Sequence, residues 1–131
     1  GSDILCVMSD ECRVGVDIET IISISVSDFT NYFTPDEFGL IKMEPQSLTH
    51  FYRLWARKEA VIKADGTGLG INLQQVDVLG ESVTIGNEKW CIYDLNLSKN
   101  SMAALATNHS YSVENFHIQQ LSPEQLFAIH L

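Results

Sequence analysis

The stretch FYRLWARKEAVIKADGTGL, residues 51–69, decides the fold predicted for this chain. Within it Phe51, Trp55, Glu59 and Lys63 recur at intervals of four residues. A helix would therefore place two aromatic rings, a carboxylate and an ammonium along one drifting stripe. We expect a long helix here that carries both core contacts and chemically active groups.

The same stretch contains its own end signal and a concentration of positive charge. Gly66 lies where a helix needs a residue that tolerates the left-handed conformation, so the helix is expected to run to about residue 64. Half of the eight Lys and Arg residues of the chain fall in this stretch, namely Arg53, Arg57, Lys58 and Lys63. We interpret them as a basic band on the helix and a candidate site for an anion.

Length and composition predict a globular protein with one domain. A chain of 131 residues with 45% hydrophobic and 19% charged residues is long enough to bury a core. We assign residues 3–131 to a single domain and interpret Gly1 and Ser2 as an expression-tag remnant. No apolar run of about 18 residues and no signal peptide are found, so a cytoplasmic protein without a membrane partner is expected.

Net charge and cysteine content exclude several classes of function. The formal net charge of -9 argues against a nucleic-acid partner, because phosphate backbones are bound by broad basic surfaces. The three cysteines are odd in number and show no CxxC spacing, so neither a disulfide framework nor a zinc site is indicated. A small phosphate ligand held together with a metal ion remains compatible with this charge.

The N-terminal segment is predicted to form a β-hairpin from residues 4–8 and 13–19. On its second strand Asp17 and Glu19 share one face, about 7 Å apart by strand geometry. Two carboxylates at that distance favour a cation between them, and Gly15 would leave room for a ligand beside them. The alternative is a solvated edge strand whose acidic residues have no special role.

Two short helices are expected before the long helix. Residues 21–33 are interpreted as a short helix that ends near Tyr32. The sequence TPDE at residues 34–37 combines a cap, a proline at the first helical position and a third-position carboxylate, which predicts a helix to about Ile41. Ser47 or Thr49 is expected to cap the long helix.

The second half of the chain has the alternating pattern of an antiparallel meander. We expect strands at residues 76–79, 82–85, 89–97 and 102–107, with a turn at Gly86-Asn87, and one more strand at residues 116–121. SPEQ at residues 122–125 repeats the capping pattern and predicts a short helix over residues 126–129. The predicted fold class is α+β, an antiparallel sheet packed against a long central helix.

If the strand and the helix lie side by side, Asp17, Glu19 and Glu59 converge with Lys63 one turn away. An all-oxygen set of ligands suits a hard cation, and magnesium binds through a few carboxylates, water and substrate phosphates. The lysine would then hold or protonate a phosphate oxygen.

Two motifs, in this order, resemble those of a known family. The sequence GVDIE at residues 15–19 and WARKEAVIKADGTGL at residues 55–69 is similar to the paired signature of the 4'-phosphopantetheinyl transferases. The second motif is closer to the surfactin-synthetase-activating type than to the holo-acyl-carrier-protein synthase type. The resemblance covers nearly the whole chain and implies that family's fold, with this chain similar to the C-terminal half of the surfactin type.

The resemblance implies magnesium-dependent transfer of 4'-phosphopantetheine from coenzyme A to a serine of an apo acyl or peptidyl carrier protein. By that match Asp17, Glu19 and Glu59 are the magnesium ligands, and Glu59 and Lys63 are catalytic. Lys58, Lys63 and Asp17 would contact the coenzyme. Carrier proteins of this kind are usually acidic, so the basic band is expected to contact them.

The resemblance also differs in length, since surfactin-type enzymes are about twice as long and consist of two similar halves. A chain of this size is therefore expected to form a homo-oligomer, a dimer or trimer, that rebuilds the cleft. The alternative is a catalytically incompetent half-domain that binds a carrier protein or a missing N-terminal half. A third interpretation is an acidic globular module in which Asp17 and Glu59 lie far apart.

Overall fold

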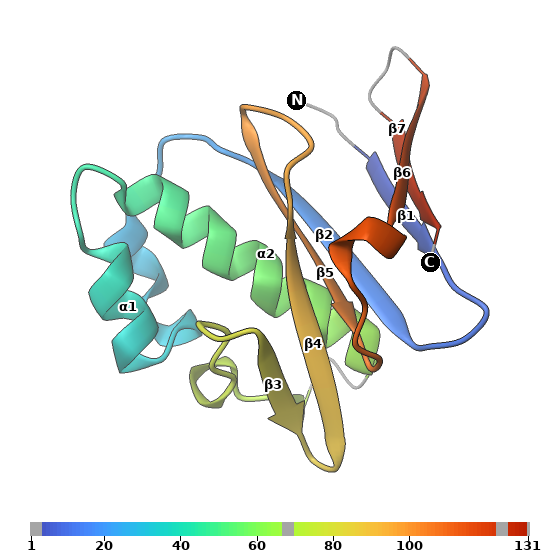
Figure 1. The fold of residues 1–131 in the computed structure, drawn as a ribbon. Coiled ribbons are helices and arrows are strands. Elements are labelled where there is room, and N and C mark those ends of the chain that lie inside the picture. The colour runs from blue at the N-terminus through green and yellow to red at the C-terminus, as the bar shows by residue number, and fades with distance from the viewer. Residues whose placement is uncertain (1–3, 67–69, 123–125, 131) are drawn as a thin grey trace.

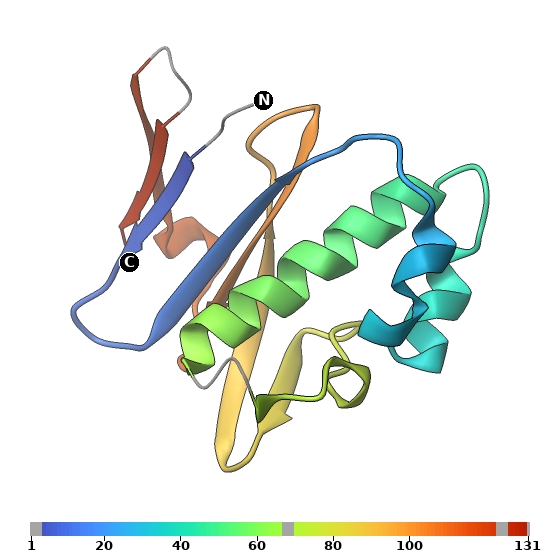
Figure 2. The same ribbon diagram turned by 180° about the vertical axis from the view of Figure 1, so that it is seen from behind.

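The central feature of the fold is a long helix that lies against one face of an antiparallel sheet (Figures 1 and 2). A computed structural model describes residues 4–66, 70–122 and 126–130. The helix is α2 (Ser47–Asp65), and the sheet contains, in spatial order, β2 (Val14–Thr20), β5 (Ser101–Thr107), β4 (Glu88–Leu95) and β3 (Ser82–Ile85). The predicted fold class is confirmed.

A second, smaller sheet packs over β2 and β5 on the other face of the four-stranded sheet. It consists of β1 (Ile4–Met8), β7 (Leu126–His130) and β6 (His117–Ser122), with β1 parallel to β7 and β6 antiparallel to it. Its buried side chains meet those of β2 and β5 in a separate apolar cluster around Leu105 and Ile129. The molecule is thus a stack of helix, large sheet and small sheet (Figure 1).

The alternating pattern of β2 determines which side chains face the helix. Val14, Val16 and Ile18 pack in the cluster that faces the small sheet. Because side chains alternate along a strand, Asp17 and Glu19 lie on the opposite face, toward α2. The predicted two faces of this strand are therefore correct.

Short helices pack around the N-terminal end of α2. The 3-10 helix η1 (Val26–Tyr32) matches the helix predicted to end near Tyr32. Helix α1 (Pro35–Ile41) begins with the predicted capping box, in which Thr34 and Glu37 bond each other's backbone N–H groups. Two further 3-10 turns, η3 (Leu73–Gln75) and η4 (Val113–Asn115), lie in the connections.

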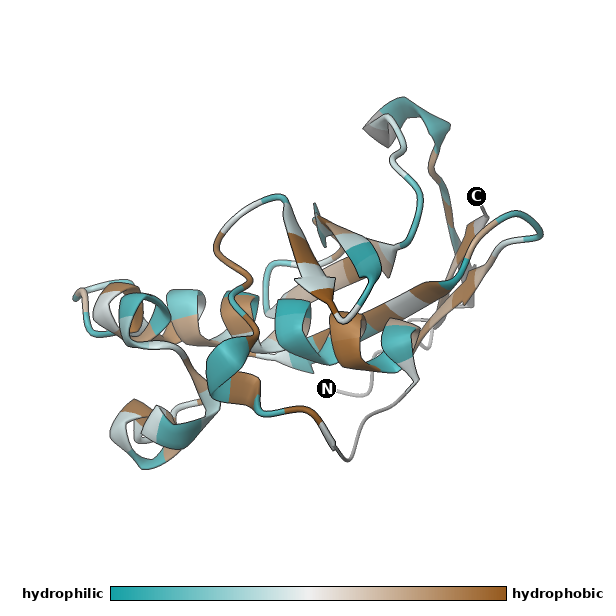
Figure 3. Ribbon diagram, turned by 90° about the horizontal axis from the view of Figure 1, so that it is seen from below, coloured by the Kyte–Doolittle hydropathy of each residue, from teal (hydrophilic) through white to brown (hydrophobic). Residues whose placement is uncertain are grey.

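The C-terminal end of α2 follows from local sequence, whereas its N-terminal end differs from the prediction. The helix begins after Gln46, which makes no side-chain capping bond, so the predicted caps Ser47 and Thr49 are wrong and lie inside the helix. Gly66 ends it with φ of 75° in the left-handed region, as predicted. Apolar and polar residues alternate along the helix in Figure 3, as expected of a helix with one buried side.

Two predictions about the ends of the sequence are wrong, each because a distant segment supplies the strand partner. Strands β1 and β2 are both present but form no hairpin, because β1 pairs with β7 in the other sheet. Residues 126–130 are strand rather than helix, since pairing with β1 and β6 overrides the local capping signal, whose residues 123–125 lie outside the described part.

The segment at residues 76–79 buries two valines but is not a strand. Its apolar side chains Val76 and Val78 belong to the core. The backbone groups that a neighbouring strand would bind are taken by charged side chains instead. Lys58 Nζ donates to the Val76 carbonyl at 2.5 Å, and Val78 N donates to Glu37 Oε2 at 2.8 Å. An apolar run alone does not distinguish these two ways of satisfying a buried backbone.

Within the described ranges, no helix is long and apolar enough to cross a membrane.

Candidate active site

The site is built where β2 and α2 approach each other unusually closely. A Cβ placed on Gly15 would lie 2.3 Å from the Ala60 carbonyl oxygen and 2.4 Å from the Ala64 amide nitrogen. Only glycine allows this approach, and the facing positions Ala104 and Ala106 on β5 are also small. The expectation that Gly15 leaves room for a ligand is therefore wrong, because the backbone of α2 fills that room.

The close approach brings the predicted carboxylates of β2 next to those of α2. Lys63 Nζ, on α2, forms an ion pair with Asp17 Oδ1, on β2, at 2.6 Å. The Asp17 side chain is only 6% exposed, whereas that of Lys63 is 52% exposed. The ammonium therefore reaches in from solvent to a carboxylate buried between strand and helix.

The second oxygen of Asp17 lacks a donor. Asp17 Oδ2 is buried, and no donor in the part of the chain that the structure describes is within hydrogen-bond distance of it. A buried carboxylate oxygen without a donor is costly, because its lost hydration is not replaced. It is therefore a position that a cation or a proton would occupy with a gain in free energy.

Glu19 lies beside Asp17 and has a strongly perturbed pKa. The pKa of Glu19 is raised from 4.5 to about 7, mainly by burial and further by the neighbouring Asp17 carboxylate and the charge of Glu59, while Trp55 opposes the shift. Two carboxylates this close share a proton more readily than they carry two charges. Glu19 thus changes its charge near neutral pH.

Glu59 completes the group on the helix side, one turn before Lys63. Burial, followed by the charge of Asp17, raises the pKa of Glu59, and the charge of Lys63 partly offsets this. The structure therefore brings together Asp17, Glu19, Glu59 and Lys63, which we call the carboxylate cluster. The third interpretation, in which Asp17 and Glu59 lie far apart, is wrong.

The chemistry of the cluster fits a hard divalent cation, although its present arrangement is not closed around one. Three carboxylates offer only oxygen ligands, and one of these oxygens is buried without a donor. Across the described ranges, however, no three His, Cys, Asp or Glu side chains are grouped closely enough to hold a metal ion. Lys63 occupies one oxygen of Asp17 in the meantime.

Lys58 lies apart from the carboxylate cluster. Its side chain is 1% exposed, and its Nζ forms an ion pair with Glu37 Oε1 at 2.7 Å. The same ammonium donates to the carbonyls of Leu73 at 2.7 Å and Val76 at 2.5 Å. Burial lowers the pKa of Lys58, and the Glu37 carboxylate partly offsets this. These contacts make Lys58 an internal link of the fold.

The predicted basic band is not a basic surface. Arg53 Nε and Arg57 Nη1 bond the two carboxylate oxygens of Asp94 at 2.8 and 3.1 Å. Arg57 is 4% exposed and also donates to the Gly80 carbonyl. No sequence pattern indicates Asp94 as the partner of two arginines, because the pairing depends on how β4 packs against α2.

Trp55 has a role that spacing alone did not reveal. Its ring packs among Phe29, Tyr32, Phe33 and Phe51, with a ring-centroid distance of 5.3 Å to Tyr32. From this aromatic cluster it also acts on Glu19, whose pKa it lowers against the effect of burial. The ring therefore connects the core to the carboxylate cluster.

Comparison with known proteins gives this geometry a family. The model of the 4'-phosphopantetheinyl transferase superfamily matches residues 13–121, which include β2, α2 and every member of the carboxylate cluster. The chain belongs to the 4'-phosphopantetheinyl transferase superfamily. The resemblance of the two motifs to this superfamily is thereby confirmed.

Relatives of this phosphopantetheinyl transferase domain are longer proteins. It is 35% identical to the 4'-phosphopantetheinyl transferase ffp of Bacillus subtilis over 53% of this chain and 32% of that protein. It is 33% identical to the L-aminoadipate-semialdehyde dehydrogenase-phosphopantetheinyl transferase of Xenopus laevis over 86% of this chain and 44% of that protein. The chain thus spans about a third to under half of the length of these relatives.

The fold is also that of a solved structure. The Thermotoga maritima holo-[acyl-carrier-protein] synthase superposes with a TM-score of 0.56, covering 86% of this chain and 79% of that one at 16% sequence identity. At this identity the likeness establishes the shared fold of the phosphopantetheinyl transferase domain.

Proposed function

We propose that this domain transfers the 4'-phosphopantetheine group of coenzyme A to a serine of an acyl or peptidyl carrier protein. The observation that carries the proposal is the carboxylate cluster, in which β2 and α2 of a member of this superfamily hold Asp17, Glu19, Glu59 and Lys63 together. Group transfer between phosphates depends mainly on positioning and on neutralising charge. Both requirements suit this group of side chains.

Magnesium is the cation that the cluster would hold. Asp17, Glu19 and Glu59 would be its ligands, and the ion would neutralise charge on the pyrophosphate of coenzyme A. Asp17 Oδ2 supports this role most directly, since it is buried and lacks a donor within the described residues. The exposed position of Lys63 at the rim allows its ammonium to leave Asp17 and bind a phosphate oxygen.

Glu59 would act as the general base. A serine hydroxyl is a poor nucleophile at neutral pH and needs its proton removed as it attacks. The serine oxygen forms a bond to the phosphorus that carries pantetheine, and the bond from that phosphorus to the bridging oxygen breaks. The products are the modified serine and 3',5'-adenosine bisphosphate, and the proton goes to Glu59. Because burial raises the pKa of Glu59, its carboxylate is a better proton acceptor than an exposed one.

Two further parts of the proposal concern the oligomeric state and the role of Lys58. The transferase is expected to act as a homo-oligomer, a dimer or trimer, whose subunits together form the cleft. Lys58 would contribute by fixing the fold rather than by contacting coenzyme A, since its ammonium is already bound by Glu37 and two carbonyls.

The test is transfer of labelled coenzyme A to several apo carrier proteins at saturating magnesium. Glu59→Gln and Lys63→Ala should each reduce turnover by about two orders of magnitude, as expected for the loss of one charge-stabilising group. Lys99→Gln, a surface change of the same charge type, should leave turnover unchanged. Wild-type turnover that survives Glu59→Gln would exclude the assigned base.

The second candidate is a domain that binds a carrier protein or a longer partner without catalysis. It is favoured by one observation, the open arrangement of the cluster, in which Lys63 rather than a closed ligand set surrounds Asp17. Calorimetry separates the two candidates. If the folded protein does not bind coenzyme A at saturating magnesium, the result favours the second candidate, the binding domain without catalysis.

A further inference from the structure

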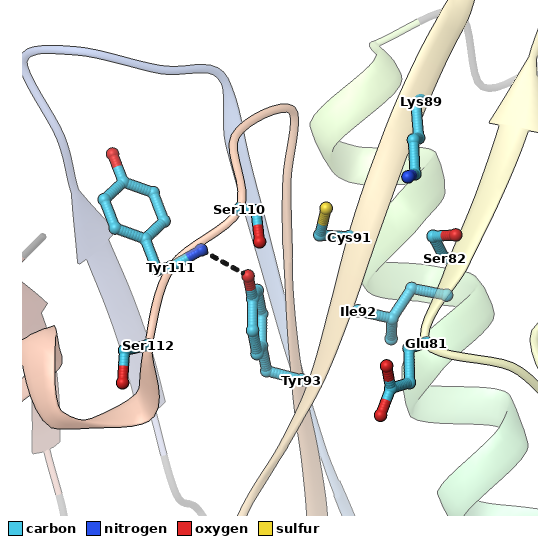
Figure 4. Close-up of a pocket in the computed structure, with 9 residues that line it drawn as sticks. All are labelled: Glu81, Ser82, Lys89, Cys91, Ile92, Tyr93, Ser110, Tyr111 and Ser112. Atoms are coloured by element: carbon cyan, nitrogen blue, oxygen red, sulfur yellow. Dashed lines mark hydrogen bonds between the residues drawn. The ribbon is translucent and has the colours of Figure 1, made fainter.

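A polar groove lies on the face of the large sheet that points away from α2. Along β4, Trp90 and Ile92 belong to the core beneath α2. Because strand side chains alternate, Lys89, Cys91 and Tyr93 emerge on the opposite face. Three separate segments form the walls of this groove, since Ile92, Glu81, Ser82 and residues 110–112 also line it (Figure 4).

The groove has the size of a small-molecule site. Its cavity volume is about 490 Å³. Small-molecule pockets commonly measure roughly 300 to 1,000 Å³. None of its lining residues belongs to the carboxylate cluster. The groove is therefore separate from the proposed transferase site.

Lys89 supplies an unpaired positive charge at one end. The ion pairs in the described ranges use Arg53, Arg57, Lys58 and Lys63, and Lys89 has no carboxylate partner there despite the net charge of -9. Figure 4 shows its side chain over the groove on the same side as Ser82. An unpaired ammonium beside a hydroxyl is suited to bind a phosphate group.

Tyr93 supplies a fixed donor at the other end. Its phenol oxygen accepts a hydrogen bond from the Tyr111 backbone N–H at 2.7 Å. The Phe116 ring packs edge-on against its ring at a centroid distance of 5.0 Å. Since the oxygen is occupied as an acceptor, the O–H hydrogen remains to be donated to a ligand. Figure 4 shows Ser110 beside this oxygen.

The distance between the two ends limits the shape of the ligand. Lys89 and Tyr93 are four residues apart on one strand, which corresponds to about 13 Å between their Cα atoms. A single ion cannot contact both. We propose that the groove binds a phosphate monoester of a small polyhydroxy compound, with the phosphate at Lys89 and Ser82. The hydroxyl groups of that compound would lie at Tyr93 and Ser110.

Calorimetric titration with ribose 5-phosphate, ribose and inorganic phosphate tests this assignment. Ribose 5-phosphate should bind at least tenfold more tightly than either of the other two probes. Lys89→Gln should remove its advantage over ribose, and Tyr93→Phe, which keeps the packing against Phe116, should weaken binding about fivefold. Lys99→Gln is the charge-matched control and should have no effect.

Two results would overturn the proposal. One is absence of ribose 5-phosphate binding, or binding that Lys89→Gln leaves intact while thermal unfolding shows a folded variant. The other is equal affinity for inorganic phosphate, which would leave the polyhydroxy part without a role.

Alkylation of Cys91 gives a second readout that is independent of heat signals. Cys91 lies midway between Lys89 and Tyr93 on the groove face, so bound ribose 5-phosphate should slow its reaction with iodoacetamide. Cys6 is exposed on the other sheet and should react at an unchanged rate. Glu59→Gln should reduce transfer by about two orders of magnitude yet retain this protection, so failure of either proposal is recognised separately.

Discussion

Glu19 couples the stability of the fold to pH. Its pKa is raised from 4.5 to about 7, so the folded state holds the proton more tightly than the unfolded state. This stabilisation is complete below about pH 4.5 and is lost as pH rises through about 7. In the absence of divalent cations the free energy of unfolding should therefore fall across this window.

Glu19→Gln should remove that loss, because the amide does not ionise. A shift of this size corresponds to about 3 kcal/mol, and solvent screening of a partly exposed group reduces it to about 1 kcal/mol. Urea unfolding at pH 5 and pH 8 measures the effect. The variant should be more stable than the wild type at pH 8, and an identical pH dependence in both proteins would contradict the assignment.

Lys63 is expected to compete with a cation for Asp17. Its ammonium lies 2.6 Å from Asp17 Oδ1 and is half exposed, so the pair contributes about 1 kcal/mol. Lys63→Gln should therefore tighten magnesium binding about fivefold in the absence of coenzyme A, while lowering turnover. Titration with magnesium chloride measures this, with Lys99→Gln as the control. Weaker magnesium binding in Lys63→Gln would show that the lysine supports the site instead.

Spacing predicts the members of the cluster but not the surroundings of their neighbours. Asp17 and Glu19 are two residues apart on a strand, and Glu59 and Lys63 are four apart on a helix, so each pair must share a face. Lys58 is adjacent to Glu59 in sequence, yet adjacent helical residues point about 100° apart. That rotation directs Lys58 into the interior toward Glu37, which a sequence motif does not reveal.

At the scale of elements, the contact of β2 with α2 depends on Gly15. Gly15→Ala would force the new methyl group against the Ala60 carbonyl oxygen, 2.3 Å away. Overpacking against the backbone should cost about 3 kcal/mol or more and separate the two halves of the cluster. The midpoint temperature of thermal unfolding and the affinity for magnesium should both fall.

Gly39→Ala is the matched control for this change. A Cβ at Gly39, inside α1, meets no atom within 4 Å, so the substitution should stabilise the protein by up to about 1 kcal/mol. Equal effects of the two substitutions would contradict the role assigned to the close approach.

Elements with a strong local signal were predictable, and those defined by distant partners were not. The capping box at Thr34 and the left-handed Gly66 act within a few residues, and both are observed. The strand at residues 126–130 exists through pairing with β1 at the other end of the chain. The identity of a strand's partner is not contained in the strand's own sequence.

At the scale of the whole molecule, the buried pair of Lys58 and Glu37 ties separate segments together. Glu37 caps α1 and accepts from Val78 N, while Lys58 on α2 binds the carbonyls of Leu73 and Val76. The pair therefore replaces strand pairing for a buried stretch of backbone. The pair therefore contributes to the stability of the whole fold and not to that of one element.

Lys58→Met should destabilise the protein by about 3–5 kcal/mol, because it leaves a buried carboxylate without its counter-charge. Glu37→Gln in the same background should recover part of the loss, since the amide needs no counter-charge. Chemical denaturation of the single and double variants measures both effects. If the Lys58→Met protein has wild-type stability but no longer binds coenzyme A, Lys58 contacts the coenzyme and does not stabilise the fold.

The parallel pairing of β1 with β7 has a consequence for how the protein is made. These strands join residues 4–8 to residues 126–130, so the longest loop in the described chain closes only there. Such distant contacts incur the largest closure entropy and tend to form last. On a ribosome, β1 must wait until residues 126–130 have emerged. Until then the apolar outer surface of β2 and β5 stays uncovered, and the nascent protein is at its most vulnerable to aggregation.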